Sequence, residues 1–288
     1  MTAIEKISGS ARPATPAGPP APVVRRSSLV PSGFVRCGLL SWRAVAGVVH
    51  IAHPFDEGSV SDAGVVDGLV SLVDAGVLSG QEQFEAAALG IIHTSAASAT
   101  DAWSAFYRNS LRELRCGISA FAPVHQRARA LLRGRSVLEV GSCFGFFALG
   151  CAMEGFDVSA CDISPGAVSL LSAAARRQGV SVDATVGDAT ALPYPDGFAD
   201  TVTLIHLLEH LDASAALTAI TEALRVARRR VVVGVPFEEQ PSPHFGHVLR
   251  LRESDLYSWA RQVPHAGAEV LVDHGGWLVL TPRRDELR

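Results

Sequence analysis

Three acidic residues and a glycine-rich turn stand at spacings that suit an adenosine-type ligand. Glu139 precedes the turn Gly141-Ser-Cys-Phe-Gly145, Asp162 follows the next apolar run, and Asp188 follows the run after that. A glycine turn between a strand and a helix lets the backbone approach a ligand closely. An acid at the tip of a second strand can accept hydrogen bonds from both ribose hydroxyls. We therefore predict a nucleoside-binding site built on these residues.

The carboxylate of Glu139 indicates that the ligand is cationic. A negative charge two residues before Gly141 would repel a phosphate. S-adenosylmethionine (SAM) carries an ammonium and a sulfonium group and has no phosphate. A dehydrogenase is the least favoured alternative, because Glu139 precedes the turn and Cys143 interrupts its glycines.

These motifs resemble those of class I SAM-dependent methyltransferases over roughly residues 135–236. The resemblance includes the turn Leu192-Pro-Tyr-Pro195, and the chain departs from the family in having Cys143 where a glycine is usual. The family places Ile163 against the adenine and uses Asp188 to read the adenine amino group. The resemblance implies SAM as cofactor, bound by Glu139, Gly141, Cys143, Gly145, Asp162, Ile163, Asp188, Ala189 and His206.

The segment Ile205-His-Leu-Leu-Glu-His-Leu211 follows the predicted fourth strand. It lacks the (Asp/Asn)-Pro-Pro-aromatic turn of amine-modifying enzymes, which favours an oxygen acceptor whose proton needs a base. His206, Glu209 and His210 stand at i, i+3 and i+4 and would share one face of a helical turn. They are similar to the Glu-x-x-Glu-His metal cluster of ubiquinone-type O-methyltransferases, with His206 replacing the first Glu. We predict no metal, and name these three as the residues that would otherwise hold a divalent ion.

A polar loop follows the predicted fifth strand, at the ligand end of the sheet. His244 and His247 are placed to orient or deprotonate a hydroxyl group, and Glu238 and Glu239 to hydrogen-bond it. The alternative is an ordinary solvated loop. The predicted catalytic residues are His210, Glu209, His247 and His244.

The elements that must position these residues alternate between strands and helices. Continuous apolar runs at 137–140, 201–205 and 230–236, with helical spacing between 213 and 227, predict an α/β fold. The fold class is a Rossmann-like doubly wound sheet with an N-terminal helical lid. The predicted organisation is a disordered Pro/Ala-rich tail (1–33), a hairpin and helical accessory or lid region (34–133) and a SAM-binding domain (134–288).

Composition argues against nucleic-acid-binding, membrane-spanning and secreted proteins. A formal charge of −4 and a pI of about 6.2 argue against a general nucleic-acid binder. No apolar run reaches membrane-spanning length, and no basic-then-apolar leader is evident. The five cysteines lack paired metal spacing and suit a reducing compartment, so we expect a cytoplasmic protein.

Four short strings indicate the acceptor. Residues 102–111, 121–125, 141–145 and 245–250 resemble the mycofactocin oligosaccharide methyltransferases, which methylate a sugar hydroxyl on the glucan of a peptide-derived redox cofactor. The resemblance implies a saccharide or glycosylated small-molecule acceptor. Two alternatives stay open: an O-methyltransferase for a lipid, quinone or polyketide hydroxyl, and a SAM-binding partner protein without catalysis.

Overall fold

The computed structural model describes residues 19–283, and its chain divides into two compact units. The first unit contains the described residues up to Ala120 together with Pro243–Gly246. The second contains Phe121–Ser242 and the residues from His247 onward. The boundary therefore lies before α4 (Ala122–Leu131), and not after residue 133 as predicted. The reason is packing: α4 contacts β9, and the Arg230 guanidinium donates a 3.0 Å hydrogen bond to the Leu131 carbonyl.

The first unit begins with a four-stranded sheet of order β1-β4-β3-β2. Strands β2, β3 and β4 are antiparallel neighbours, as expected of the predicted hairpin region, whereas β1 pairs with β4 in parallel. The strands are β1 (Val23–Arg26), β2 (Val35–Cys37), β3 (Leu40–Val45) and β4 (Val48–His53).

Strand β1 corrects the prediction that residues 1–33 form a disordered tail. Val23 lies opposite His50, and Arg26 lies opposite His53. The β-branched pair Val23-Val24 has strand propensity, which the average composition of the Pro/Ala-rich region conceals. Residues 1–18 lie outside the described part of the chain.

Three helices complete the first unit, and a short 3-10 helix packs on α2. Ser61 caps α1 by accepting a hydrogen bond from the Gly64 N–H, and Ser98 caps α3 through the Asp101 N–H. Phe84 of α2 and Phe106 of α3 are fully buried. The elements are α1 (Asp62–Asp74), α2 (Gly80–Thr94), α3 (Ala99–Arg115) and η2 (Pro243–Phe245). A lid role for them stays a prediction.

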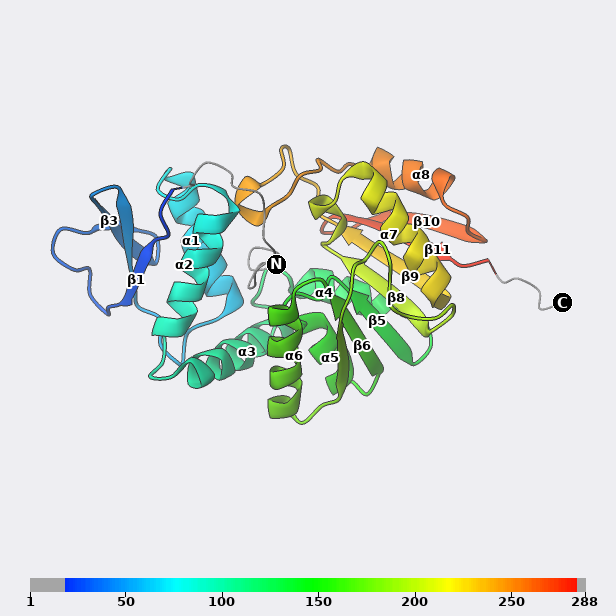
Figure 1. The fold of residues 1–288 in the computed structure, drawn as a ribbon, viewed down its shortest axis with the longest axis horizontal. Helices are drawn as coiled ribbons and strands as arrows, with labels where there is room; N and C mark the ends of the chain where they lie inside the picture. The colour runs from blue at the N-terminus through cyan, green and yellow to red at the C-terminus, as the bar shows by residue number, and fades with distance from the viewer. Residues whose placement is uncertain (1–18, 284–288) are drawn as a thin grey trace. The chain divides into compact units, whose positions relative to one another are not determined.

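The second unit confirms the predicted α/β fold. Its seven-stranded sheet has the order β10-β11-β9-β8-β5-β6-β7, parallel from β9 to β7, with β11 and β10 antiparallel at one edge (Figure 1). Its further elements are β5 (Ser136–Val140), α5 (Phe146–Met153), β6 (Asp157–Asp162), α6 (Pro165–Gln178), β7 (Val182–Val186), β8 (Ala199–Ile205), η1 (Leu208–His210), α7 (Ala213–Val226), β9 (Ala227–Val235), α8 (Glu253–Gln262), β10 (Gly267–Val272) and β11 (Gly276–Thr281).

The strand order reverses between β5 and β8. From β5 the chain proceeds outward to β6 and β7, and then returns to build β8 and β9 on the other side. Ligands of open α/β sheets bind at the carboxyl ends of the strands beside such a switch point. The glycine turn after β5 and the His/Glu segment after β8 therefore lie at the same edge of the sheet.

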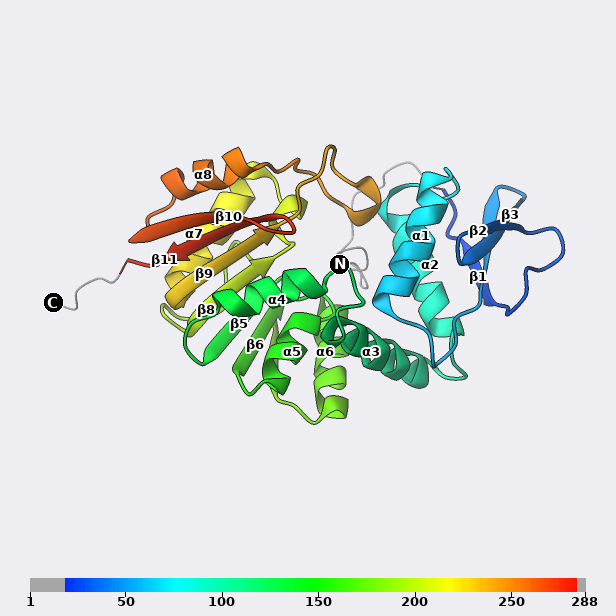
Figure 2. The same cartoon turned by 180° about the vertical axis from the view of Figure 1, so that it is seen from behind.

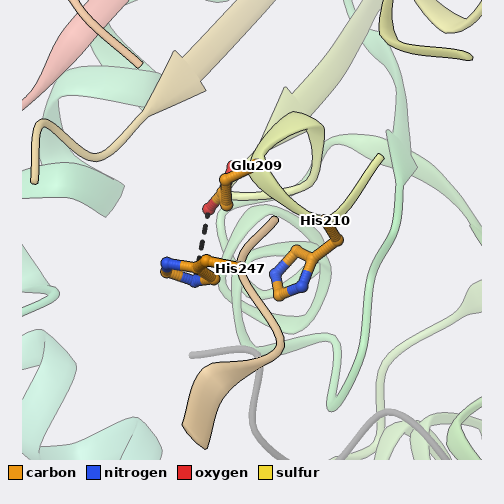
Figure 3. A group of neighbouring side chains, drawn as sticks. All are labelled: Glu209, His210 and His247. Carbon is orange, nitrogen blue, oxygen red and sulfur yellow. Dashed lines mark ion pairs between the residues drawn. The ribbon is translucent and has the colours of Figure 1, made fainter. Parts of the chain in front are cut away.

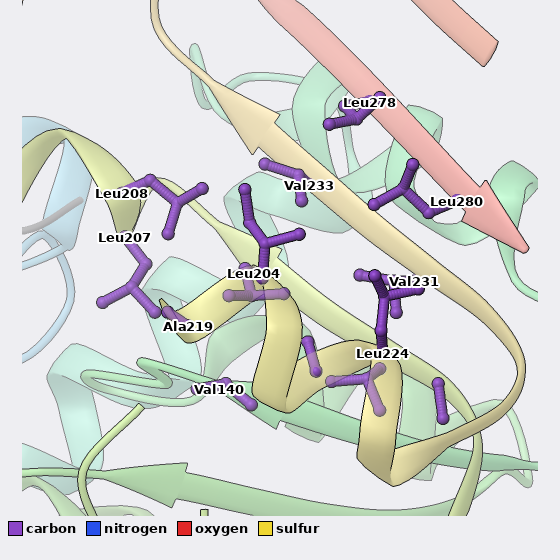
Figure 4. Packing of buried hydrophobic residues seen from close by; sticks show 14 of the residues in the cluster. Val140, Leu204, Leu207, Leu208, Ala219, Leu224, Val231, Val233, Leu278 and Leu280 are labelled. Carbon is purple, nitrogen blue, oxygen red and sulfur yellow. The ribbon is translucent and has the colours of Figure 1, made fainter. Parts of the chain in front are cut away.

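Helices cover both faces of this sheet. Helix α7 packs over β8 and β9, whereas α4 lies on the opposite face (Figure 2). Figure 4 shows Ala219 and Leu224 of α7 beside Val231 and Val233 of β9, in one hydrophobic cluster. Burying a leucine or valine side chain contributes about 1.5–3 kcal/mol relative to exposure. This core fixes β8 and β9, and thereby the segments that leave their carboxyl ends.

The longest helix of the described chain, α3, has 17 residues. No helix between residues 19 and 283 combines the length and apolarity needed to cross a bilayer.

Candidate active site

The glycine turn adopts left-handed backbone torsions at three alternate positions. The φ angles are +71° at Gly141, +49° at Cys143 and +67° at Gly145. A Cβ atom on Gly141 would lie 2.7 Å from Leu207 Cδ1, and one on Gly145 would lie 2.4 Å from Leu171 Cδ1. Both outer positions therefore require glycine for space as well as torsion. Cys143 occupies the middle position with a torsion that most residues avoid.

Asp162 braces this turn from the end of β6. Its Oδ2 accepts a 2.7 Å hydrogen bond from the Cys143 N–H, and its Oδ1 accepts a 2.8 Å bond from the Ser164 N–H. Burial raises the pKa of this carboxyl, and the two hydrogen bonds partly offset that effect. The next residue, Ile163, has 69% of its surface exposed, and its contact with the adenine stays a prediction.

Glu139 is buried under α5. Its Oε2 accepts a 2.9 Å hydrogen bond from the Ala148 N–H, so the carboxylate ties β5 to the first turns of α5. Its pKa is raised to about 8, chiefly by burial; the hydrogen bond from Ala148 opposes this shift, and the nearby Asp162 carboxyl adds to it. A cationic ligand at the turn would favour the ionised form of both acids.

Asp188 lies near the start of the loop after β7 and has an exposed side chain. Its Oδ1 accepts 2.8 Å hydrogen bonds from both the N–H and the hydroxyl of Thr190, which shapes the local turn. The neighbouring Ala189 is half-buried and packs against the main core. The adenine-reading role of Asp188 and Ala189 stays a prediction.

Ser142 is a residue that the sequence analysis did not select. Its side chain lies inside the glycine turn with 1% exposure, and its Oγ has no hydrogen-bond partner among the described residues. A buried hydroxyl of this kind costs free energy unless a ligand or water satisfies it. The signal in the sequence was a polar residue between Gly141 and Cys143.

The predicted helical turn after β8 is wrong in part. Only residues 208–210 form a helix, the 3-10 helix η1, and His206 stands before it with a left-handed φ of +52°. The His206 N–H donates a 2.8 Å hydrogen bond to the Gly234 carbonyl of β9, which draws the chain out of helical geometry. Nevertheless, His206 Nδ1 lies 3.6 Å from Glu209 Oε1.

The loop after β9 brings His247 to this cluster. His247 Nδ1 and Glu238 Oε2 are 2.8 Å apart, and His247 Nε2 is 4.0 Å from Glu209 Oε1. The imidazole rings of His210 and His247 cross nearly at right angles with centroids 4.8 Å apart. Figure 3 shows Glu209, His210 and His247 directed toward one another.

His244 is not a member of the histidine–glutamate cluster. It belongs to η2 in the first unit, where its ring packs against Phe84 and Phe245 at centroid distances of 5.4 and 4.2 Å. Of the four predicted catalytic residues, the structure thus brings together His210, Glu209 and His247. Glu238, predicted to hydrogen-bond a hydroxyl group of the acceptor, lies against the ring of His247.

Burial sets the charge state of these groups. It lowers the pKa of His206 well below the ordinary value and also lowers the pKa of His247, although Glu238 opposes the shift at His247. Burial raises the pKa of Glu209 to about 8. Both histidines are therefore neutral near pH 7, so each has a lone pair that can accept a proton or bind a metal ion.

Residues 138–233 match the family model described as "Methyltransferase domain". A 138-residue segment, 43% of this chain, is 33% identical to ajmaline N-methyltransferase of Rauvolfia serpentina, over 46% of that enzyme. A 95-residue segment, 33% of this chain, is 36% identical to demethylmenaquinone methyltransferase of Beutenbergia cavernae, over 37% of its length. The chain spans less than half the length of these curated relatives. The crystal structure of PH0226 protein from Pyrococcus horikoshii OT3 is similar with a TM-score of 0.48 and 18% identity, over 59% of this chain and 92% of that one.

The family match runs from β5 to β9, which are the parallel strands that carry the glycine turn, Asp162, Asp188 and the histidine–glutamate cluster. Over this third of the chain the protein is therefore similar to methyltransferase domains.

Proposed function

We propose that the protein is a SAM-dependent O-methyltransferase that methylates a sugar hydroxyl on an acceptor of the mycofactocin oligosaccharide type. The observation that carries the proposal is the buried histidine–glutamate cluster after β8. It lies at the same edge of the sheet as the glycine turn, because β5 and β8 are parallel neighbours.

The chemistry of the cluster suits an oxygen acceptor. Methyl transfer from a sulfonium is an in-line displacement, so the enzyme must align the acceptor and remove its proton. A sugar hydroxyl is a weak nucleophile until that proton leaves. When no metal ion is bound, the neutral imidazole of His247 can accept it through Nε2.

Acids around the turn suit SAM as the methyl donor. Glu139 and Asp162 place two buried carboxyl groups beside the loop, and Ser142 adds a buried hydroxyl. A ligand bearing an ammonium and ribose hydroxyls would satisfy all three groups. Phosphate ligands would not stabilise the ionised form of these carboxyl groups, whereas a cation would.

A quinone hydroxyl is the second candidate acceptor. The observation that favours a quinone is the 36% identity of one segment to a demethylmenaquinone methyltransferase, whose name indicates a quinone substrate but not a hydroxyl acceptor. An apolar acceptor would gain little from the polar side chains of the cluster beyond proton removal.

The test is methyl transfer from isotope-labelled SAM to matched acceptors. Purified protein is incubated with β-linked glucose oligomers, mycofactocin glycans and a demethylated quinone, and products are analysed by mass spectrometry. We expect one methyl group to be added to a hexose. SAM binding without transfer to any saccharide would refute the sugar assignment, and transfer to the quinone alone would establish the second candidate.

A further inference from the structure

The cluster after β8 has the donor atoms of a transition-metal site. We propose that Glu209, His210 and His247 bind a divalent first-row transition-metal ion such as Zn²⁺ or Fe²⁺. One donor atom from each residue lies within 4.8 Å of the other two. This departs from the sequence-based expectation of no metal, and it replaces His206 with a residue from a distant loop (Figure 3).

Glu209 supplies the first argument. Its side chain is 1% exposed, and neither carboxylate oxygen accepts a hydrogen bond from another described residue. Burying a carboxylate costs several kcal/mol unless a positive charge or hydrogen bonds compensate it. A cation held between Glu209 and the two imidazoles would provide that compensation.

The partner of His247 supplies the second argument. Glu238 Oε2 lies 2.8 Å from His247 Nδ1, and Glu238 Oε1 accepts a 2.8 Å hydrogen bond from the Ser242 hydroxyl. Metal-binding histidines commonly donate their other ring N–H to a carboxylate, which fixes the tautomer and the ring orientation. This arrangement turns Nε2 toward Glu209, at 4.0 Å from its Oε1. Such a separation is too long for a hydrogen bond but suits two ligands of one ion.

Backbone hydrogen bonds hold the two segments together. The N–H groups of Val248 and Leu249 both donate to the Glu209 carbonyl, at 2.8 and 3.1 Å. The loop that carries His247 is therefore attached to η1 itself. Ligand atoms around a tetrahedral ion with bonds of ~2.1 Å lie ~3.4 Å apart, so binding requires the side chains to close slightly on the ion.

The donor set indicates which ion would bind. Two imidazole nitrogens and one carboxylate oxygen suit Zn²⁺, Fe²⁺ and Co²⁺, whereas Mg²⁺ and Ca²⁺ prefer oxygen ligands. A bound ion would lower the pKa of a hydroxyl that coordinates it. That consequence for the acceptor rests on the proposed function, whereas metal binding itself does not.

The experiment measures binding of Zn²⁺ and Co²⁺ to tag-free full-length protein that has been treated with a chelator. We expect one Zn²⁺ per chain by calorimetry and by elemental analysis, and a visible absorption band when Co²⁺ is added. Mg²⁺ should bind far more weakly.

Variants locate the ion. Glu209→Gln and His247→Ala should each reduce Zn²⁺ affinity by at least ~100-fold, and Glu238→Gln by about 10-fold, as loss of a supporting carboxylate does. His274→Ala is the matched control. His274 Nε2 lies 3.7 Å from Asp273 Oδ1 on an exposed turn, so this variant removes a histidine–carboxylate pair outside the cluster and should leave the affinity unchanged.

Two results would overturn the inference: no stoichiometric Zn²⁺ binding by the wild type, or binding that Glu209→Gln, His247→Ala and Glu238→Gln leave intact. If the two ligand variants fail to fold, the Co²⁺ band of the wild type and the conservative Glu238→Gln decide. Methyl transfer by protein that binds no metal would remove the metal site and keep the proposed function. Metal binding without methyl transfer to any acceptor would keep the metal site and remove the proposed function.

Discussion

At the scale of single residues, the glycine turn shows how side-chain size and torsion act together. Cys143 has a φ of +49°, a conformation that costs a non-glycine residue about 1 kcal/mol. Its N–H donates to Asp162, and its side chain is 2% exposed within the core. The hydrogen bond and the burial therefore stabilise a torsion that glycine usually provides at this position.

Gly141→Ala should reduce SAM affinity by at least ~10-fold. The added Cβ would lie 2.7 Å from Leu207 Cδ1 at a φ of +71°, so the turn must move. Gly155→Ala is the matched control, because Gly155 has a φ of +87° but nothing within 4 Å of the added atom. It carries torsional strain of about 1 kcal/mol without a clash. Calorimetric titration with SAM compares the two, and equal affinities would contradict a steric requirement at Gly141.

His210→Ala should leave SAM binding intact and slow methyl transfer by ~100-fold or more, the usual range for loss of proton-transfer chemistry. The reason is that His210 lies in the cluster with Glu209 and His247, away from the glycine turn in sequence. Calorimetric titration measures SAM binding, and steady-state kinetics with the acceptor found in the transfer assay measure turnover. Unchanged turnover would remove His210 from the mechanism.

At the scale of elements, buried histidines link the packing of helices to pH. His125 of α4 is 3% exposed, and its ring meets that of Phe147 in α5 edge to face, with centroids 5.6 Å apart. Burial lowers its pKa to about 3, with a smaller effect from Arg129. In the unfolded chain the ordinary pKa of 6.5 applies. Stability is therefore full above pH 6.5 and falls as the pH drops toward 3, because the unfolded state binds the proton first.

Between pH 7.5 and pH 5, we expect His125 to lower the free energy of unfolding by about 2 kcal/mol. The slope below the unfolded-state pKa is about 1.36 kcal/mol per pH unit. Urea unfolding of the wild type and His125→Gln at both pH values isolates this term. The variant should lose about 2 kcal/mol less than the wild type. The exposed His274→Gln should behave as the wild type does, and a pH dependence identical in all three proteins would refute the assignment.

At the scale of the whole molecule, the predicted SAM-binding residues all lie in the second unit. The first unit has its own sheet and its own helices, with buried side chains such as Phe84 and Phe106. The predicted donor-binding residues thus all lie in one compact part of the chain.

SAM should slow backbone hydrogen exchange in the second unit, at residues 141–145, 162–164 and 188–191. These loops leave the carboxyl ends of β5, β6 and β7, where a bound nucleoside would restrict opening. Helices α1 and α3 should exchange at unchanged rates. Hydrogen-exchange mass spectrometry with and without SAM makes the comparison. Protection confined to the first unit would contradict the prediction that SAM binds to the second unit.

The sequence by itself determined the α/β fold and the order of the acids along it. Apolar runs that are continuous, such as 230–236, indicate strands buried on both faces, and parallel strands bring their carboxyl ends to one edge. The sequence alone therefore places Glu139 and Asp162 beside the same turn. Local periodicity and strand direction are sufficient to predict the fold class and the edge of the sheet at which these acids lie.

Only the tertiary structure decided which side chains form the cluster and where the units divide. The path of the loop after β9 places His247 against Glu209 and Glu238, whereas His244 lies with the first unit. Strand β1 and helix α4 likewise depend on partners far along the chain. Contacts of this kind arise from loop paths and packing between distant segments, which the spacing of residues along the sequence does not encode.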